Sequence, residues 1–222
     1  MGMNAPRPGT GPLRRLVVLR HAKSAWPAGV ADHDRPLAPR GRRDAPAAGR
    51  VLAEADLLPD LALCSTAVRA RQTWELAAAQ WGTPPAVRLD ARLYAADAPD
   101  LLAAVREVPG QVGTLLLIGH NPGLEELVLE LAGDGVDDTL DRLGVKFPTS
   151  AIAVLAWHGE SWQTLAPGTA LLTELTVPEA TSTADLGPVA RVAGATSGTG
   201  PSPRGPGAGV ADRVPRGAGP PG

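Results

Sequence analysis

The fold of this 222-residue chain is decided by the stretch Leu16-Val17-Val18-Leu19-Arg20-His21. Its four apolar residues predict a buried strand, and strands of this kind usually belong to parallel sheets whose faces are covered by helices. In open sheets of that class, ligands bind outside the carboxyl ends of the strands. An arginine and a histidine at the end of such a strand therefore indicate an active site rather than a core.

A second apolar strand ends in the same way. The residues Thr114-Leu115-Leu116-Leu117-Ile118 run directly into Gly119-His120-Asn121-Pro122-Gly123. Two of the four histidines in the chain therefore follow apolar strands. We expect the other two, His33 and His158, in exposed loops, and the loop that carries His33 should border the pocket.

Strands and helices alternate along the chain. Apolar spacing and turn residues predict strands at 61–64, 87–89 and 150–157, a hairpin from the last of these to a strand at 162–166, and helices at 39–55, 99–108 and 122–132. A further helix follows Ser65, which stands at the N-cap position, and ends at Gly82. The alternation predicts an α/β fold, a three-layer sandwich with a mainly parallel central sheet and an antiparallel edge.

Composition places the folded part in the middle of the chain. The 222 residues include 26 Gly and 23 Pro, and no Leu follows Leu186. A segment of that kind cannot bury enough apolar surface to offset the entropy lost on ordering it. We therefore expect one domain at residues 13–178, between a disordered N-terminus at 1–12 and a disordered tail rich in Gly, Pro and Ala at 179–222.

Charge, cysteine content and hydropathy argue against several classes of protein. The 21 basic and 23 acidic residues give a formal net charge of -2 without a basic cluster, so we expect no nucleic-acid partner. The lone Cys64 excludes an internal disulfide and is expected to be buried. No apolar run has the length of a membrane span, and no secretory segment precedes Leu16, so we expect a cytoplasmic protein without a membrane partner. The acidic run Glu125–Asp141 is interpreted as a solvated helix face and loop, with a docking surface for a basic partner as the alternative.

Parallel strands bring the polar motifs to one edge of the sheet. Arg20 and His21, the turn from Ser65 to Arg69, and His120 would then meet in one pocket. Two arginines offer planar forks for phosphate oxygens, and the start of the helix after Ser65 adds free backbone N–H groups. The sequence therefore predicts an anion site that contains histidines.

A histidine in such a site can act as a nucleophile. Neutral imidazole is nucleophilic near neutral pH, and the two arginines should favour the neutral form of His21. Attack on phosphorus would give a phosphohistidine, while Arg20, Arg69 and His120 stabilise the charge on the phosphoryl oxygens. Water would then release inorganic phosphate, and this chemistry requires no metal or other cofactor.

Four motifs together resemble those of the histidine phosphatase superfamily, which has a phosphoglycerate-mutase-like fold. They are Arg20-His21-Ala22, Arg35-Pro36-Leu37-Ala38-Pro39-Arg40-Gly41, Ser65-Thr66-Ala67-Val68-Arg69-Ala70-Arg71-Gln72-Thr73 and Gly119-His120-Asn121-Pro122. The resemblance covers about residues 14–166. The short SixA-type phosphohistidine phosphatases look most similar, because only 31 residues, Thr83–Gly113, stand where larger members carry an insertion that caps the pocket and supplies a general acid.

The resemblance implies an open, shallow pocket, which suits phosphate displayed on a protein. Asp97 is the candidate general acid, with an N-cap before the 99–108 helix as the alternative. Lys23 and Ser24 are candidates for substrate contact. Ser65 and Asn121 are interpreted either as phosphate contacts or as helix caps.

These observations predict a phosphatase that acts through a phosphohistidine intermediate, with phosphohistidine in proteins as the expected substrate. The imidazole leaving group, whose conjugate acid has a pKa of about 6.5, needs less help from an enzymatic acid than an alkoxide does. The first alternative is a phosphatase of a small-molecule phosphate ester. The second is a non-catalytic phosphoprotein-binding module, although binding alone would not need a nucleophile.

Overall fold

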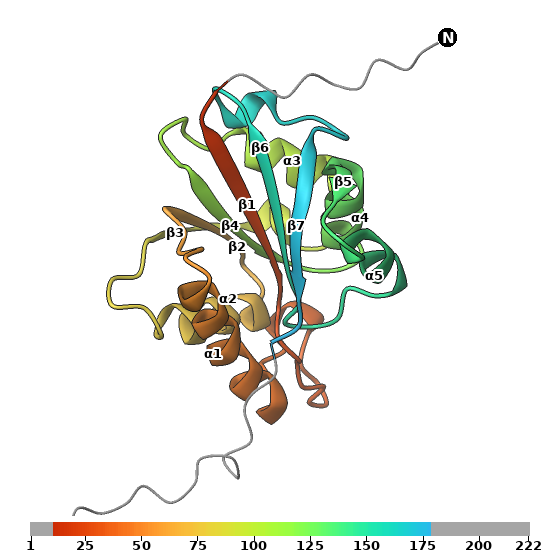
Figure 1. Cartoon of the computed structure of the whole chain (residues 1–222). Helices are drawn as coiled ribbons and strands as arrows, with labels where there is room; N and C mark the ends of the chain where they lie inside the picture. The colour runs from red at the N-terminus through yellow and green to blue at the C-terminus, as the bar shows by residue number, and fades with distance from the viewer. Residues whose placement is uncertain (1–10, 179–222) are drawn as a thin grey trace, which may run out of the picture. The chain divides into compact units, whose positions relative to one another are not determined.

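The structure is a computed structural model that describes residues 11–178 (Figure 1). The tail at 179–222 and most of the N-terminal segment 1–12, for both of which disorder is expected, lie outside the described residues. No helix within 11–178 is long and apolar enough to cross a membrane.

A seven-stranded sheet forms the centre of this part of the chain, with the strand order β3-β2-β4-β1-β6-β7-β5. The four strands β3, β2, β4 and β1 are parallel, β6 runs antiparallel to both β1 and β7, and β5 is parallel to β7. The strands are β1 (Leu13–Arg20), β2 (Leu61–Ser65), β3 (Ala86–Asp90), β4 (Thr114–Gly119), β5 (Ala132–Gly135), β6 (Ile152–His158) and β7 (Ala170–Thr176). The result is the expected α/β fold with a mainly parallel sheet.

Helices cover both faces of the sheet, as Figure 1 shows. Leu16 and Val18 of β1 belong to the apolar cluster beneath α3 (Ala98–Arg106), α4 (Gly123–Leu131) and α5 (Thr139–Val145). Val17 and Leu19 point the other way, into the cluster beneath α1 (Pro39–Glu54) and α2 (Val68–Ala78). Alternation along a strand thus fills both cores, and each fully buried aliphatic side chain contributes roughly 1.5–3 kcal/mol.

Helices α1 and α2 pack closely because α1 has a glycine at the contact. A Cβ on Gly49 would collide with the carbonyl oxygen of Ala77 in α2. Trp81 reinforces the contact by donating its indole N–H to the Gly49 carbonyl at 2.8 Å. Helix α1 also runs through Gly41 and Pro46, two residues with low helix propensity. Packing therefore overrides local propensity here.

The segment after β6 differs from the sequence prediction. The strand expected at 162–166 is instead a short 3-10 helix, Trp162–Thr164, and β6 pairs with β7. The physical reason is Trp162, which is fully buried, packs against Trp157 with ring centroids 4.8 Å apart, and donates to the carbonyl of Val112 at 2.8 Å. These apolar residues fill the end of the core instead of pairing as a strand. Strands β5 and β7 and helix α5 were not predicted.

The expected burial of Cys64 and the expected solvation of the acidic run are confirmed, but β5 and the start of α5 stand where a loop was expected in that run. Cys64 is a free, buried thiol in β2, and burial raises its pKa to about 12. The acidic run 125–141 spans α4, β5 and the start of α5, and its acidic side chains are exposed except for the partly buried Glu125.

Candidate active site

The carboxyl ends of β1, β2 and β4 lie side by side and carry the predicted site residues. Arg20 lies beside Gly119 in the register of β1 and β4, and Cys64 lies beside Ile118 in the register of β2 and β4. His21 and His120 directly follow β1 and β4, and their ring centroids are 4.9 Å apart. The predicted convergence of distant motifs is therefore present in the fold.

Hydrogen bonds to two elements, β4 and α2, fix the backbone at His21 and Ala22. The His21 amide donates to the Gly119 carbonyl of β4 at 3.1 Å. The Ala22 amide donates to Thr73 Oγ1 at 3.0 Å, and that hydroxyl donates to the Arg69 carbonyl at 2.7 Å. Thr73, a buried residue of α2, thus ties the end of β1 to the turn of α2 that carries Arg69. This positioning role was not predicted.

The hydrogen bonds of the His21 ring define which nitrogen carries its proton. Nδ1 lies 2.8 Å from the carbonyl oxygen of Ala22, which can only accept, so Nδ1 carries the proton. Arg69 Nε donates to the other nitrogen, Nε2, at 3.3 Å. Nε2 therefore presents a lone pair in the site.

The surroundings of His21 keep its ring neutral. The side chain is only 8% exposed, and this burial, together with the charges of Arg69, Arg20 and Arg35, lowers the pKa of His21 from 6.5 to about 4. Burial has the largest effect because it removes water from the charged form. At neutral pH the ring is thus uncharged, as a nucleophile must be.

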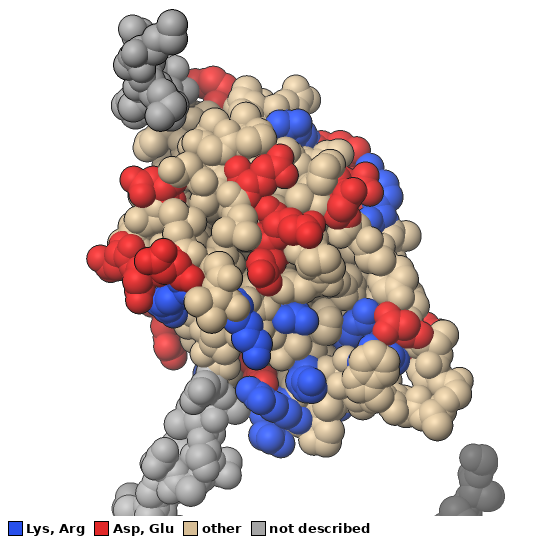
Figure 2. All heavy atoms as spheres, turned by 90° about the vertical axis from the view of Figure 1, so that its right-hand side faces the viewer, with Lys and Arg blue, Asp and Glu red and all other residues tan. Residues whose placement is uncertain are grey.

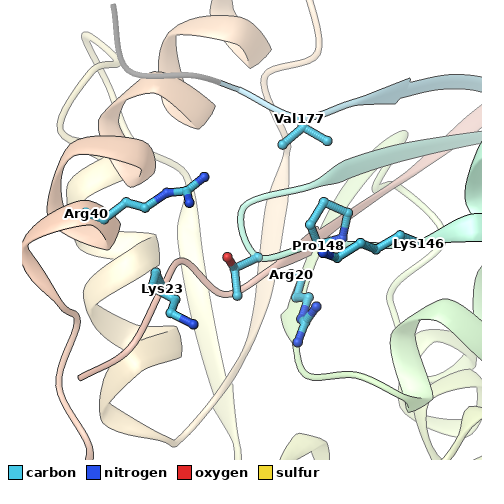
Figure 3. Close-up of a pocket in the computed structure, with 7 residues that line it drawn as sticks. Arg20, Lys23, Arg40, Lys146, Pro148 and Val177 are labelled. Atoms are coloured by element: carbon cyan, nitrogen blue, oxygen red, sulfur yellow. The ribbon is translucent and has the colours of Figure 1, made fainter. Parts of the chain in front are cut away.

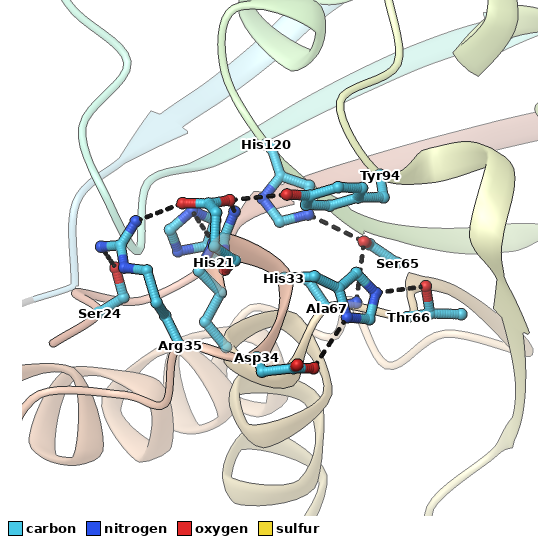
Figure 4. Close-up of polar contacts among 12 residues, drawn as sticks. His21, Ser24, His33, Asp34, Arg35, Ser65, Thr66, Ala67, Tyr94 and His120 are labelled. Atoms are coloured by element: carbon cyan, nitrogen blue, oxygen red, sulfur yellow. Dashed lines mark hydrogen bonds and ion pairs between the residues drawn. The ribbon is translucent and has the colours of Figure 1, made fainter. Parts of the chain in front are cut away.

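The second histidine is held from below by Ser65. His120 is also 8% exposed, and its Nε2 lies 2.8 Å from Ser65 Oγ. Ser65 Oγ already accepts from the Ala67 amide at 3.3 Å, so its hydroxyl proton is free to point at Nε2. When Ser65 donates in this way, the proton of His120 is on Nδ1, a buried atom without a hydrogen-bond partner among the described residues. In Figure 4 this nitrogen points away from Ser65, on the side where His21 lies.

Burial also keeps His120 uncharged. It lowers the pKa of His120 from 6.5 to about 3, and the neighbouring His21 and Arg69 lower it further in the same sense. A neutral ring with Nδ1–H is a hydrogen-bond donor without a charge. Such a donor can bond a phosphoryl oxygen.

Arg69 reaches into the site from the first turn of α2, where it is bonded to Asp32. Its Nη1 donates to the Asp32 carbonyl at 2.5 Å, and its Nη2 donates to the Asp32 carboxylate at 3.0 Å. The same carboxylate accepts from Arg35 at 2.7 Å and from the Tyr94 hydroxyl at 2.8 Å. These donors hold the pKa of Asp32 well below its usual range. Asp32 is thus a permanent carboxylate bound to two cationic groups of the site.

Sequence reasoning did not identify Asp32, Arg35 and Tyr94 as site residues. Arg35 begins the motif Arg35–Gly41, which resembles the family, and that motif could have identified Arg35 as a site residue. Its guanidinium is buried, donates to Ser24 Oγ at 2.6 Å, and lies over the exposed ring of Trp26. Tyr94 packs edge-on to His120 at 5.6 Å. Tyr94 lies outside all four sequence motifs, so nothing in the sequence indicated this contact.

The two predicted contact residues in the loop after β1 have different environments. Ser24 is buried and accepts from Arg35, so it positions an arginine of the site. Lys23 is exposed and lines a neighbouring pocket together with Arg20. Arg20 donates to the Phe147 carbonyl at 2.7 Å, and burial lowers its pKa while Glu125 opposes that change.

The two residues weighed as helix caps do not cap helices. Ser65 ends β2 and lies under His120, because α2 begins only at Val68. Asn121 donates to Glu125 at 2.7 Å and to the Phe147 carbonyl at 3.1 Å, and the N-cap of α4 is Pro122. The Oδ1 atom of Asn121 is buried and has no partner among the described residues.

Asp97 caps a helix. Its side chain accepts from the Asp100 amide at 3.0 Å at the N-cap of α3, and the residue is exposed. No hydrogen bond or ion pair of the described residues joins it to either histidine. The capping alternative therefore accounts for its position.

The site is more enclosed than the short 83–113 interval predicts. Both histidines are nearly buried, and Tyr94 from this interval lies over His120. Asp32, in the loop between β1 and α1, accepts hydrogen bonds from Arg69 and Tyr94. This loop therefore also covers the two histidines. His33 borders it, with its ring edge-on to Tyr94 and Nε2 3.0 Å from Thr66 Oγ1 (Figure 4).

A metal site needs several ligand side chains arranged around one point. Among residues 11–178 no group of three or more His, Cys, Asp or Glu side chains is arranged to hold a metal ion.

Comparisons with known proteins agree with this architecture. The model of the histidine phosphatase superfamily (branch 1) matches residues 16–101, which include His21 and Arg69. The SixA protein from Nakamurella multipartitia is 34% identical, with a TM-score of 0.68 over 77% of this chain and 99% of that one. The chain belongs to the histidine phosphatase superfamily, a family of phosphatases.

Within that superfamily it is of the SixA type. The SixA structure from Agrobacterium tumefaciens is 30% identical, with a TM-score of 0.62 over 74% of this chain and 98% of that one. An uncharacterized protein of Mycobacterium tuberculosis is 45% identical over 162 residues, 72% of this chain and 99% of the relative. The protein histidine phosphatase SixA complexed with tungstate shares the fold at 23% identity, with a TM-score of 0.60 over 74% of this chain and 97% of that one.

Proposed function

We propose that the protein removes phosphate from phosphohistidine in proteins, with His21 as the nucleophile. The observation that carries the covalent mechanism is the hydrogen bonding of His21. Its Nδ1 proton is held by the Ala22 carbonyl, so the Nε2 lone pair faces Arg69. A burial-lowered pKa keeps that lone pair available at neutral pH.

In the first step His21 Nε2 attacks phosphorus, and the bond between phosphorus and the substrate nitrogen breaks. The electron pair of that bond leaves with the substrate imidazole, which takes a proton from water. The phosphoryl group is now on His21. In the second step water attacks phosphorus and the bond to Nε2 breaks, so its electron pair returns to the ring of His21, which stays in the site as neutral histidine. The attacking water gives up a proton, which replaces the one taken from water in the first step, and inorganic phosphate leaves.

Three groups of the chain can stabilise the phosphoryl oxygens during both steps. Arg69 brings a planar fork beside Nε2, and Arg20 adds a second positive charge. The unpaired Nδ1–H of His120 is a third donor, held in place by Ser65. These side chains supply positive charge and hydrogen bonds, so the mechanism requires no metal ion or other cofactor.

The lack of a protonated carboxyl in the network around His21 favours phosphohistidine as the substrate. Asp32 is the carboxyl of that network among the described residues, and Arg35, Tyr94 and Arg69 hold it ionised. An alkoxide leaving group needs a strong proton donor, whereas imidazole leaves with the help of water. The SixA relatives support the same substrate class, since the proteins from Nakamurella multipartitia and Agrobacterium tumefaciens, 34% and 30% identical to this chain, are named as putative phosphohistidine phosphatases.

Trapping the intermediate tests the covalent step. Brief incubation with a labelled phosphohistidine protein, followed by denaturation without acid, should leave acid-labile, alkali-stable phosphate on the wild-type chain. The label should be absent from His21→Ala and present in His158→Ala, which removes an exposed histidine beyond the site. Wild-type protein that turns over substrate without label would exclude the intermediate.

A substrate panel tests the choice of substrate. Rates on the phosphohistidine protein are compared with rates on sugar and nucleotide monophosphates. A higher kcat/KM for an ester would replace phosphohistidine by a small-molecule substrate. Tight binding of all of them without turnover would indicate a phosphoprotein-binding module.

A further inference from the structure

A second pocket adjoins the active site and is positively charged. Its cavity of about 330 Å³ is in the lower range for small-ligand sites, which measure roughly 300–1,000 Å³. Its wall contains four cationic side chains and no acidic one (Figure 3). The lining residues are Arg20, Lys23, Arg40, Lys146, Pro148, Thr149 and Val177.

The four cations come from four separate segments. Arg20 ends β1, Lys23 lies in the loop that follows, Arg40 is in the first turn of α1, and Lys146 follows α5. A Cβ on Gly41 would collide with the Lys23 carbonyl oxygen, so the glycine next to Arg40 lets α1 lie directly against the loop. The tertiary fold therefore creates this cluster.

Few negative charges of the described chain oppose this cluster. Within residues 11–178, Lys23 and Lys146 take part in no ion pair, and Arg40 contacts Asp44 through a single pair of atoms 3.2 Å apart. Glu125 raises the pKa of Arg20 against the effect of burial, and no ion pair of the described residues joins the two side chains. Neighbouring like charges repel one another, so an anion in the pocket would relieve that repulsion.

The surface shows the same separation of charge. Figure 2 shows Lys and Arg gathered toward the lower end of this face, the end at which β1 and β4 finish in Figure 1, and Asp and Glu mainly above them. Arg20 ends β1 and belongs both to the proposed catalytic set and to the wall of the second pocket, so the two sites meet at this end of the sheet.

We propose that this pocket is a second anion site, which binds a negatively charged group of the substrate other than the phosphoryl group under attack. Arg20 belongs to both the wall of this pocket and the proposed catalytic set, so one ligand can reach both sites. The chemistry recognised is a carboxylate or a second phosphate. If the substrate is a phosphohistidine protein, as the proposed function on which this assignment rests states, the second anion is the carboxylate of an acidic side chain close to the phosphohistidine.

Non-hydrolysable ligands test the second site without reference to catalysis. Alkyl monophosphonates are compared by calorimetry with α,ω-bisphosphonates of the same length, with linkers of about three to six carbons. We expect at least one bisphosphonate to bind about tenfold more tightly, well beyond the factor of two that two identical ends give. A ratio of about two for every linker would refute the second site.

Charge-removing variants locate the effect. Arg40→Gln and Lys146→Gln change exposed side chains of the pocket wall, and the affinity ratio should fall about threefold in each and approach two in the double variant. Arg50→Gln is the matched control for Arg40→Gln. It removes a positive charge from α1 about 15 Å further along the helix, outside the pocket wall, and should keep the wild-type affinity ratio. A ratio that survives in the double variant would also refute the proposal.

Two substrate pairs then distinguish the source of the second anion. Phosphohistidine peptides with Glu or Gln beside the modified residue are compared, as are small bisphosphate and monophosphate esters. We expect the Glu peptide to have the higher kcat/KM and to lose that advantage in the double variant. A charge preference among the esters alone would assign the pocket to a metabolite. If no phosphohistidine peptide is turned over, the proposed function fails, and the phosphonate titration still decides the second site.

Discussion

Replacing His120 by glutamine should make the protein less sensitive to mild acid. His120 is buried above Ser65, and burial lowers its pKa to about 3. The unfolded chain exposes the same ring at an ordinary pKa of about 6.5, so it binds a proton more readily than the folded chain. The stabilisation from the neutral buried ring is therefore complete above pH 6.5 and is lost progressively as the pH falls towards 3.

The size of the effect follows from that difference. Between pH 7 and pH 5 the unfolded ring takes up most of a proton while folded His120 takes up almost none, which lowers the free energy of unfolding by about 2 kcal/mol. His21, whose folded pKa is about 4, adds a similar loss of about 2 kcal/mol over the same range. The wild-type protein should thus lose about 2 kcal/mol more than His120→Gln, which retains His21.

Urea denaturation at pH 7 and pH 5 measures this difference. The other histidines are common to both proteins, so their contributions cancel in the comparison. Arg50→Gln, which removes an exposed charge and no histidine, should show the wild-type loss. Equal losses in wild type and His120→Gln would show that the folded site can protonate His120 easily, and the account of a neutral ring would be wrong.

Three other substitutions test single residues. Arg69→Lys keeps a charge but loses the fork that contacts His21 and Asp32, so kcat/KM should fall on the order of 10²-fold. Asp97→Ala should lower the free energy of unfolding by about 1 kcal/mol through loss of the α3 cap, and Asp97→Asn should keep both stability and kcat/KM. Asp32→Asn removes a negative charge from the partly exposed pair with Arg69, so calorimetry should show inorganic phosphate binding about tenfold more tightly.

A different result would contradict each of these three predictions. An Arg69→Lys variant with nearly wild-type kcat/KM would mean that charge without the fork is sufficient. A large loss of kcat/KM in Asp97→Asn would return Asp97 to the role of general acid. Weaker phosphate binding by Asp32→Asn would show that this carboxylate positions Arg69 rather than competing with phosphate for it.

The strand ends could be predicted because their signals are local. The apolar run of residues 16–19 and the one that ends at Ile118 define buried strands by composition alone, and parallel packing forces their carboxyl ends to one edge. Arg20, His21 and His120 follow directly from that rule. The prediction of a strand at 162–166 was wrong, because the segment around the buried Trp162 fills the core as a short 3-10 helix and its apolar composition resembles that of a strand.

What the sequence by itself determined is the parallel α/β core and the presence of two histidines and two arginines at its edge. Only the tertiary structure decided the details that control the chemistry. Asp32 and Arg35 join the site because the loop between β1 and α1 folds back over the strand ends, and Tyr94 reaches Asp32 from the segment after β3. Ser65 bonds His120 because β2 is one residue longer than expected. Hydrogen-bond partners and burial depend on which distant segments come within about 3 Å of each other, and the pattern of a single strand or helix does not contain that information.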